Sequence, residues 1–180
     1  MKTKNLVRIA ILGAIGYVLM LLEFPLLPTA GFLKLNFCDI PSLLAAFSMG
    51  PLAGLMVVAI ENALHLFQTF SGGIGELANF LVSGTFVVVA GVFYRNNHTK
   101  KGARVALILG GALMVIMALF ANRFLLLPLY MPAGTPEQFT SLLLSAILPF
   151  NLIKGLIIIA LTLVLYKPLS PLLKNKTERS

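Results

Sequence analysis

Long apolar stretches dominate the chain and predict membrane-spanning helices. A helix needs about 20 mostly apolar residues to cross a hydrocarbon layer about 30 Å thick. The candidate spans are Leu6–Glu23, Asp39–Met49, Pro51–Thr69, Gly75–Tyr94, Ala103–Leu127 and Glu137–Tyr166. The second span is short for a crossing. The pattern predicts an all-α integral membrane protein, a six-transmembrane-helix bundle that forms a single membrane domain over residues 1–180.

Prolines divide and shape these spans. Gly50 and Pro51 separate the second helix from the third, because proline ends or kinks a helix. Pro149 provides a cause for a bend in the long last helix. Asp39 and Pro41 are typical of a helix start, with Asp39 as the N-cap and Pro41 in the first turn.

Composition excludes a soluble protein. The chain is 58% hydrophobic and 11% charged, with a mean hydropathy of +0.95, whereas soluble domains carry roughly 25% charged residues. The net charge of +8 indicates membrane topology rather than nucleic-acid binding in so apolar a chain. The single cysteine, Cys38, allows no internal disulfide.

The basic residues predict the orientation in the cell membrane. With six crossings and a cytoplasmic N-terminus, both termini are cytoplasmic, and 11 of the 14 Lys and Arg residues fall inside, as the positive-inside rule expects. These residues are Lys2, Lys4, Arg8, Arg95, Lys100, Lys101, Arg104, Lys167, Lys174, Lys176 and Arg179. Lys34, Arg123 and Lys154 are left over and are candidates for functional roles.

Lys154 is the most informative of the three. It lies mid-way along the last helix and three residues after Asn151, so both side chains project from one helical face. A charge inside a membrane is expensive and usually faces a cavity or a partner. We expect Lys154 to contact a ligand; the alternatives are a structural carboxylate partner such as Glu76, or snorkelling to the interface.

Other polar residues gather near the predicted outer ends of the helices. Asn122 lies there on the fifth helix, where it contacts a ligand or forms an interhelical hydrogen bond, and the neighbouring Arg123 is interpreted as an interface anchor. The glycine-rich segment before the fourth helix leads to Glu76, which suits the helix dipole, and to Asn79 one turn deeper.

Glu61 and His65 stand four residues apart on the third helix. A carboxylate–imidazole pair at this spacing has two interpretations: a structural pair that lines the bundle, or a functional pair that acts as a proton relay or as half of a metal site. The structural pair is favoured because no second pair has metal-ligand spacing. The other interpretation predicts a small intramembrane enzyme.

The segment between the first two helices, residues 25–38, is long and apolar. Long loops in compact domains are usually functional, and we expect this first outer loop to fold back over the bundle as a lid. No phosphate-binding loop for nucleotide hydrolysis and no nucleophile elbow are present. A small bundle without its own energy source fits a binding subunit that partners drive.

Several segments occur together in a recognisable order. They are Leu33–Ser42 (LKLNFCDIPS), Gly50–Gly54 (GPLAG), Gly75–Phe80 (GELANF), Leu126–Tyr130 (LLPLY) and Pro149–Gly155 (PFNLIKG). Together they resemble the riboflavin-specific substrate-binding (S) components of energy-coupling factor (ECF) vitamin transporters. The resemblance covers nearly the whole chain, and the last segment is its most specific part.

The resemblance implies six helices, cytoplasmic termini and a vitamin pocket open to the outside. It implies a transmembrane coupling subunit and two cytoplasmic ATPase subunits as partners, with Ala10 and Ala14 of the first helix at the coupling subunit. It implies riboflavin as transported ligand, with no cofactor and no catalytic or metal site. Asn122, Asn151 and Lys154 then fall where polar groups meet the flavin, whereas Lys34 replaces the small polar residue expected in the loop.

The chemistry of a flavin fits these residues. Its pyrimidine edge carries carbonyl acceptors and one N–H donor, which asparagine and lysine complement. The full set of predicted ligand-binding residues is Asn122, Asn151, Lys154, Glu76, Asn79, Lys34, Leu33, Leu35, Phe37, Phe80 and Leu127. The alternative within transport is FMN or another vitamin; for FMN, Lys34 or Arg123 would supply cations at the pocket mouth.

Overall fold

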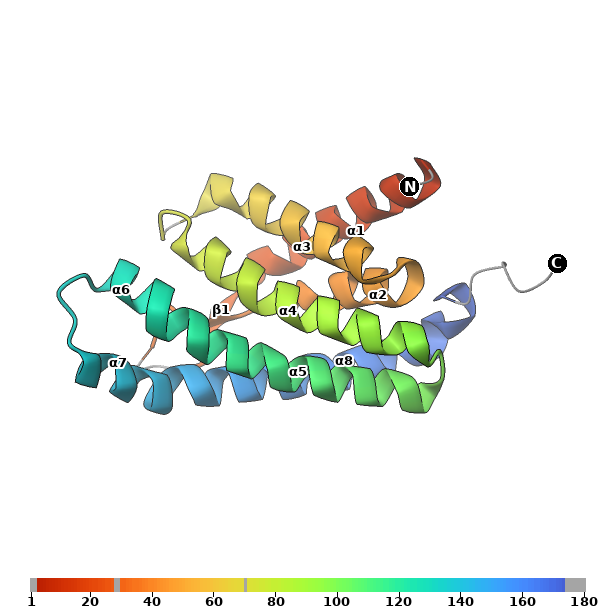
Figure 1. The fold of residues 1–180 in the computed structure, drawn as a ribbon. Coiled ribbons are helices and arrows are strands. Elements are labelled where there is room, and N and C mark those ends of the chain that lie inside the picture. The colour runs from red at the N-terminus through yellow and green to blue at the C-terminus, as the bar shows by residue number, and fades with distance from the viewer. Residues whose placement is uncertain (1–2, 28–29, 70, 174–180) are drawn as a thin grey trace.

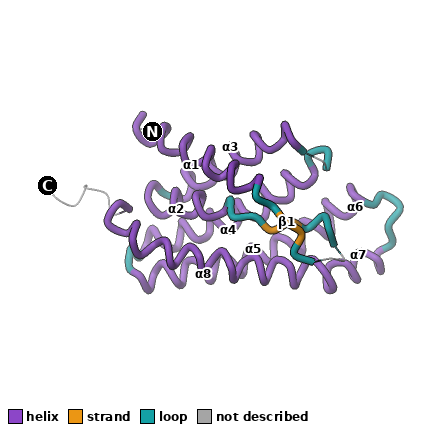
Figure 2. Tube along the Cα trace, turned by 180° about the vertical axis from the view of Figure 1, so that it is seen from behind, coloured by secondary structure: helices purple, strands orange, loops and turns teal. Residues whose placement is uncertain are grey.

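The computed structural model is a bundle of long helices with a small two-stranded hairpin set into one side (Figures 1 and 2). The structure describes residues 3–27, 30–69 and 71–173, with side chains up to residue 166. The elements are α1 (Thr3–Leu21), β1 (Phe24–Pro25), β2 (Lys34–Leu35), α2 (Asp39–Met49), α3 (Pro51–His65), η1 (Leu66–Gln68), α4 (Ile74–Asn96), α5 (Lys100–Ala121), η2 (Asn122–Leu126), α6 (Leu127–Tyr130), α7 (Pro136–Leu142), η3 (Leu143–Ile147) and α8 (Leu148–Leu173).

The predicted helical membrane bundle is confirmed, with one short member. Among the described residues, five helical runs are long and apolar enough to cross a membrane: α1, α3 with η1, α4, α5 through α6, and α7 through α8. α2 has 11 residues and rises only about 16 Å, at 1.5 Å per residue. It is therefore too short to cross by itself, and it occupies the half of the bundle toward the N-terminus (Figure 1).

A glycine turn and two threonine N-caps define the ends of several helices. Gly50 adopts a φ of 102° between α2 and α3, a backbone conformation that glycine tolerates best. The Thr99 side chain caps α5 by accepting the Gly102 N–H at 3.0 Å. Thr135 and Gln138 form a reciprocal capping box at the start of α7.

Two π turns interrupt the long outer helices, and each precedes a proline. η2 ends two residues before Pro128, and η3 ends two residues before Pro149. Proline has no N–H and clashes with the preceding turn, so the helix widens there rather than continuing regularly. The bend expected at Pro149 thus takes the form of a π turn, in keeping with the causes of irregularity in long helices.

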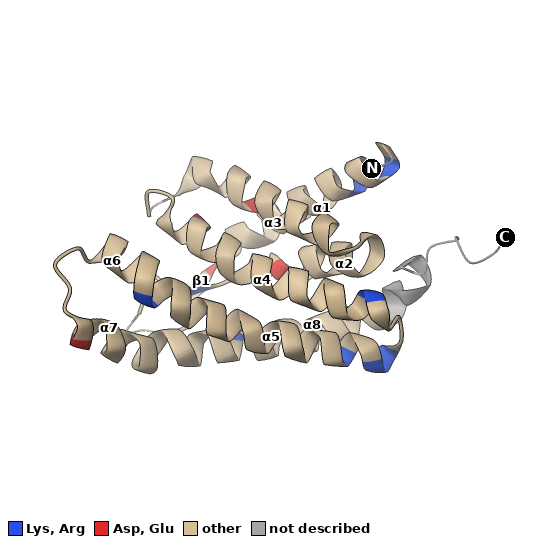
Figure 3. Ribbon diagram, viewed as in Figure 1, with Lys and Arg blue, Asp and Glu red and all other residues tan. Residues whose placement is uncertain are grey.

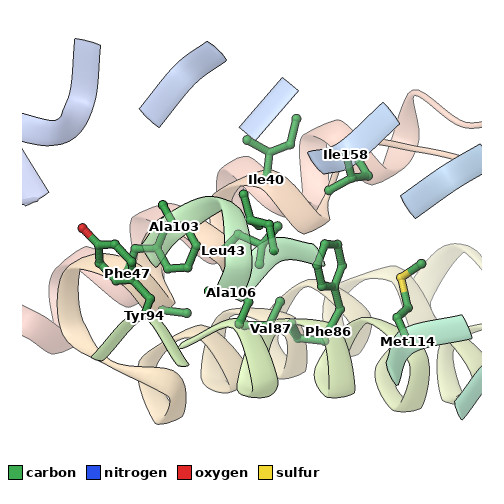
Figure 4. Close-up of a cluster of buried hydrophobic side chains, with 14 of the residues drawn as sticks. Ile40, Leu43, Phe47, Phe86, Val87, Tyr94, Ala103, Ala106, Met114 and Ile158 are labelled. Atoms are coloured by element: carbon green, nitrogen blue, oxygen red, sulfur yellow. The ribbon is translucent and has the colours of Figure 1, made fainter. Parts of the chain in front are cut away.

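The main core fills the half of the bundle toward the termini. Leu43, Phe86, Val87 and Leu107 of this cluster are fully buried, from α2, α4 and α5 (Figure 4). Aromatic rings close this end of the core, where the Tyr94 and Tyr166 hydroxyls hydrogen-bond at 2.7 Å. Tight packing here leaves the other half of the bundle for a site.

The described basic residues of the predicted cytoplasmic segments gather at one end of the bundle. Basic residues of α1 and of the α4–α5 connection lie at the end that also holds the N-terminus (Figure 3). α8 ends on this side as well (Figure 1), because the five spanning runs and the return of the chain through the hairpin and α2 together bring it back to the end where it began. The predicted inside residues Lys2, Lys174, Lys176 and Arg179 lie outside the described residues, as does the side chain of Lys167. That this end faces the cytoplasm stays a prediction.

Candidate functional site

A cavity of about 320 Å³ lies in the half of the bundle away from the termini. Its wall combines residues from the end of α1, the hairpin, the end of α3, the first half of α4, η2, α6 and the first turns of α8. The lining residues are Met20, Glu23, Phe32, Leu33, Lys34, Asn36, His65, Ser71, Gly75, Glu76, Ala78, Asn79, Val82, Asn122, Tyr130, Phe150, Asn151 and Lys154. The wall is thus mainly apolar with a few polar groups, as is usual for small-molecule sites.

The hairpin between α1 and α2 contributes one side of the cavity wall, and its role as a lid stays a prediction. Phe24 pairs with Leu35 and Pro25 with Lys34 in antiparallel register, and Lys34 forms an ion pair with Glu23. The Phe32 ring lies 6.0 Å from the Tyr130 ring, centroid to centroid. This contact joins the hairpin to α6 across the cavity.

Lys154 is buried in the cavity wall and carries an ion pair. Its Nζ lies 3.0 Å from Asp39 Oδ2, 3.3 Å from Asn79 Oδ1 and 3.5 Å from Ser83 Oγ. The Lys154 side chain is 5% exposed and that of Asp39 is 0% exposed. The ammonium group therefore links α8 to the start of α2 and to α4.

Asp39 bears on two expectations. Lys154 has the structural carboxylate partner that was the alternative to ligand contact, and this partner is Asp39 rather than Glu76. The expectation that Asp39 caps α2 was also wrong, because Asp39 is the first residue of the helix and no side-chain cap is formed there. Pro41 does lie in the first turn. A carboxylate that neutralises a buried lysine is not available for capping, since its oxygens face the interior.

Asn122 and Asn151 present their amides in the same way from neighbouring helices. Asn122 Nδ2 donates to the Ala118 carbonyl at 2.7 Å, and Asn151 Nδ2 donates to the Ile147 carbonyl at 2.8 Å. Within the described part of the chain their Oδ1 atoms accept no hydrogen bond. Each asparagine thus offers the cavity an acceptor and a remaining N–H donor.

Glu76 is the centre of a hydrogen-bonded group at the start of α4. Its Oε1 lies 2.7 Å from His65 Nδ1, and its Oε2 accepts the hydroxyls of Thr69 at 2.9 Å and Ser71 at 3.2 Å. Gly75 N–H donates to Ser71 Oγ at 2.9 Å. These contacts fix the turn between α3 and α4 and hold the carboxylate at the cavity wall.

The predicted pair of Glu61 and His65 was wrong. His65 contacts Glu76, while Glu61 is fully buried and its Oε2 accepts the Ser42 hydroxyl at 3.2 Å. The i, i+4 spacing places two residues on the same helical face but does not make them partners when other helices offer better ones. No group of three or more metal-ligating side chains occurs among the described residues.

The structure brings most of the predicted ligand-binding residues to one cavity. Those on its wall are Leu33, Lys34, Glu76, Asn79, Asn122, Asn151 and Lys154. Leu35, Phe37, Phe80 and Leu127 are not on the wall. Phe37 and Phe80 pack against the main core, and Leu127 packs with Phe139 and Ile147.

Strand and helix geometry explains two of these placements, those of Leu35 and Phe80. Lys34 and Asn36 line the cavity while Leu35, between them, is buried away from it, because successive side chains of an extended strand point to opposite sides. Asn36 was not predicted as a site residue, but it follows from this alternation once Lys34 is placed. Phe80 is one residue beyond Asn79, which turns it about 100° around the helix.

α1 has two faces with different neighbours. Ala10 and Ala14 are exposed on the outer face, among large exposed apolar side chains such as Ile11 and Val18. Gly13 and Gly16 are buried on the inner face. The small-residue pair predicted for a partner subunit is therefore accessible on the described surface.

Arg123 lies with its guanidinium 5.7 Å from the Phe139 ring centroid and is not on the cavity wall.

A bundle of membrane-spanning helices with an internal cavity lined by a few polar groups is the architecture of a membrane protein with a small-molecule site. The sequence matches the family described as ECF transporter, substrate-specific component, over residues 4–166. The chain belongs to this family. It is a multi-pass protein of the cell membrane and a transporter component, not an enzyme.

Named relatives and a solved structure agree with this family assignment. The chain is 36% identical to the riboflavin transporter RibU of Staphylococcus aureus (strain TCH60) over 178 residues, covering 97% of this chain and 94% of the relative. It is 35% identical to the riboflavin transporter FmnP of Bacillus subtilis (strain 168), covering 98% and 97%. A solved structure, described as "Structure and mechanism of the S component of a bacterial ECF transporter", matches with a TM-score of 0.84 at 35% identity, covering 97% of this chain and 100% of its own.

Proposed function

We propose that this S component binds riboflavin in the covered cavity and captures it at the outer face of the cell membrane. The observation that carries the proposal is the convergence of amide and ammonium groups from three helices on one cavity: Asn79 of α4, Asn122 of η2, and Asn151 and Lys154 of α8. The riboflavin transporters among its relatives support the identity of the ligand.

The cavity chemistry matches the two ends of an isoalloxazine ring. The pyrimidine edge carries carbonyl acceptors and one N–H donor, and the amides of Asn122 and Asn151 offer both kinds of group. The dimethylbenzene end is apolar, as are Leu33, Val82 and Phe150 on the wall. A buried polar contact left unmade costs about 1–3 kcal/mol, so these few groups decide which ring system is retained.

Partners then provide the energy for uptake. We propose that a transmembrane coupling subunit docks on the exposed face of α1 around Ala10 and Ala14, where small side chains let another helix approach closely. Two cytoplasmic ATPase subunits on the side of the termini hydrolyse ATP to drive reorientation and release. The basic residues at that end support a cytoplasmic orientation.

Titration of the purified protein with riboflavin tests the ligand. Quenching of flavin fluorescence reports binding. Asn151→Ala removes one cavity amide and should weaken binding by about tenfold to a hundredfold, because a lost buried hydrogen bond costs about 1–3 kcal/mol. The matched control is Asn96→Ala at the exposed end of α4, which should leave the affinity unchanged.

Two results would contradict the proposal. If the wild-type protein does not quench riboflavin fluorescence, the ligand is wrong. If Asn151→Ala binds riboflavin as tightly as Asn96→Ala does, the ligand binds outside the cavity described here.

A further inference from the structure

Asn62 of α3 is buried behind the cavity and is not one of the residues that line its wall. Its Nδ2 donates to the Val58 carbonyl at 2.7 Å, one turn earlier in the same helix. Its Oδ1 accepts the Asn79 Nδ2 at 3.2 Å, across the contact between α3 and α4. The side chain therefore links the backbone of α3 to a polar residue of the wall.

Hydrogen bonds continue from Asn79 to the ammonium group of Lys154. The Asn79 Oδ1 accepts the Lys154 Nζ at 3.3 Å and the Ser83 hydroxyl at 3.2 Å. The Asn79 Nδ2 also lies 3.7 Å from Cys38 Sγ, a weak acceptor. Both ends of the Asn79 amide are thus engaged, and Asn79 connects Asn62 to the lysine.

The two ends of this chain of hydrogen bonds fix its direction. A backbone carbonyl only accepts hydrogen bonds and a lysine ammonium only donates them, whereas an amide side chain does both. Because the Val58 carbonyl accepts the Nδ2 of Asn62, the Asn62 Oδ1 faces Asn79. Asn79 must then turn its Nδ2 to Asn62 and its Oδ1 to Lys154. A flipped Asn79 amide would place oxygen against oxygen at Asn62 and N–H groups against the ammonium.

We propose that Asn62 is a positioning residue for flavin binding, which acts through Asn79 to hold the Lys154 ammonium at the cavity wall. The inference rests on the proposed function, in which that ammonium is one of the groups that meet the flavin. The ammonium has three N–H donors, and its three acceptors are Asp39 Oδ2, Asn79 Oδ1 and Ser83 Oγ. A supporting residue that locks a binding group in place improves affinity, because less ordering is left for the ligand to impose.

Titration of Asn62→Leu and Asn62→Ala with riboflavin measures this effect in the full-length protein. Leucine keeps nearly the volume of asparagine and alanine does not, and neither accepts a hydrogen bond. Both substitutions should raise the riboflavin Kd by about fivefold to tenfold, because the network loses one acceptor. The matched control is Thr85→Val, which removes a hydroxyl that donates to the Leu81 carbonyl of its own helix. This control should leave the Kd within about twofold, since such a bond serves only the local helix.

A double-mutant cycle with Asn79→Ala separates positioning from a general structural role. If Asn62 acts through Asn79, the Asn62→Leu substitution should change the Kd by less than about twofold once residue 79 is alanine, because residues that act in one network are not additive. A merely structural loss would be of the same size in both backgrounds.

The outcomes separate this inference from the proposed function. An unchanged or lower Kd in the two Asn62 variants overturns the inference, and so does a loss confined to one of them or an equal loss in both backgrounds. In each of these cases the wild type still binds riboflavin, and the proposed function stands. Wild-type protein that does not quench riboflavin fluorescence overturns the proposed function, and this inference with it.

Discussion

The buried ion pair between Lys154 and Asp39 leads to an asymmetric prediction for stability. Lys154 Nζ has three polar neighbours: Asp39 at 3.0 Å, Asn79 at 3.3 Å and Ser83 at 3.5 Å. Fully buried Glu61 lies within electrostatic reach of both members of the pair. Removal of the lysine therefore strands two carboxylates, whereas removal of Asp39 leaves Glu61 near the lysine.

The two substitutions should differ in cost. Breaking a buried pair by deleting one partner costs about 3–5 kcal/mol, and Lys154→Met also removes the hydrogen bonds to Asn79 and Ser83. We expect Lys154→Met to lie in that range, which corresponds to a fall in Tm of roughly 6–20 °C for a protein of this size. Asp39→Asn should cost less, about 1–3 kcal/mol, because it preserves shape and leaves a second carboxylate nearby.

Thermal unfolding in detergent, without ligand, measures both effects. Ligand is left out because a bound molecule adds stability of its own. Lys101→Met, at the exposed start of α5, is the control for loss of a lysine and should change stability by no more than about 0.5 kcal/mol. The reasoning is refuted if Lys154→Met unfolds at the same temperature as Lys101→Met, or if Asp39→Asn is the more damaging of the two.

Three further predictions concern α1 and the hairpin. Gly16→Ala should lower the Tm, because a Cβ at this position would collide with the carboxylate of Glu61. The expected loss in the free energy of unfolding is about 1–3 kcal/mol, and an unchanged melting curve would argue against this contact. Ala14→Leu, on the exposed face, should leave the Tm of the isolated subunit unchanged but reduce co-purification with the coupling subunit. Phe32→Ala should speed riboflavin dissociation by about fivefold or more in stopped-flow fluorescence, because loss of the ring contact with Tyr130, of roughly 1 kcal/mol, loosens the hairpin; an unchanged off-rate would show that the hairpin is held elsewhere.

The helices could be predicted from the sequence because each is defined by local information. Apolar runs of spanning length mark them, and the three-residue spacing of Asn151 and Lys154 places both on one face of α8. The structure has both residues on the cavity wall. The common end of the basic clusters was also predictable, since it follows from counting crossings.

The partners of the buried charges could not be predicted in this way. Asp39 and Lys154 are far apart in the chain, and the carboxylate named from the sequence as a partner for the lysine was Glu76, because nothing local pointed to Asp39. Local rules even favoured a different role for Asp39, that of an N-cap. An irregularity at Pro149 was predictable from the proline itself, whereas its form, a π turn, was not.

The short length of α2 determines the route that a captured molecule takes. The helix begins in mid-bundle at Asp39, beside Lys154 on the cavity wall, so the cavity ends about halfway through the bundle. Beyond it lies the core around Leu43 and Phe86, and protein interiors are packed as densely as organic crystals. We therefore expect a flavin that arrives beneath the hairpin to depart by the same opening. On this proposal, delivery to the far side of the membrane involves reorientation of the whole bundle rather than a channel through it.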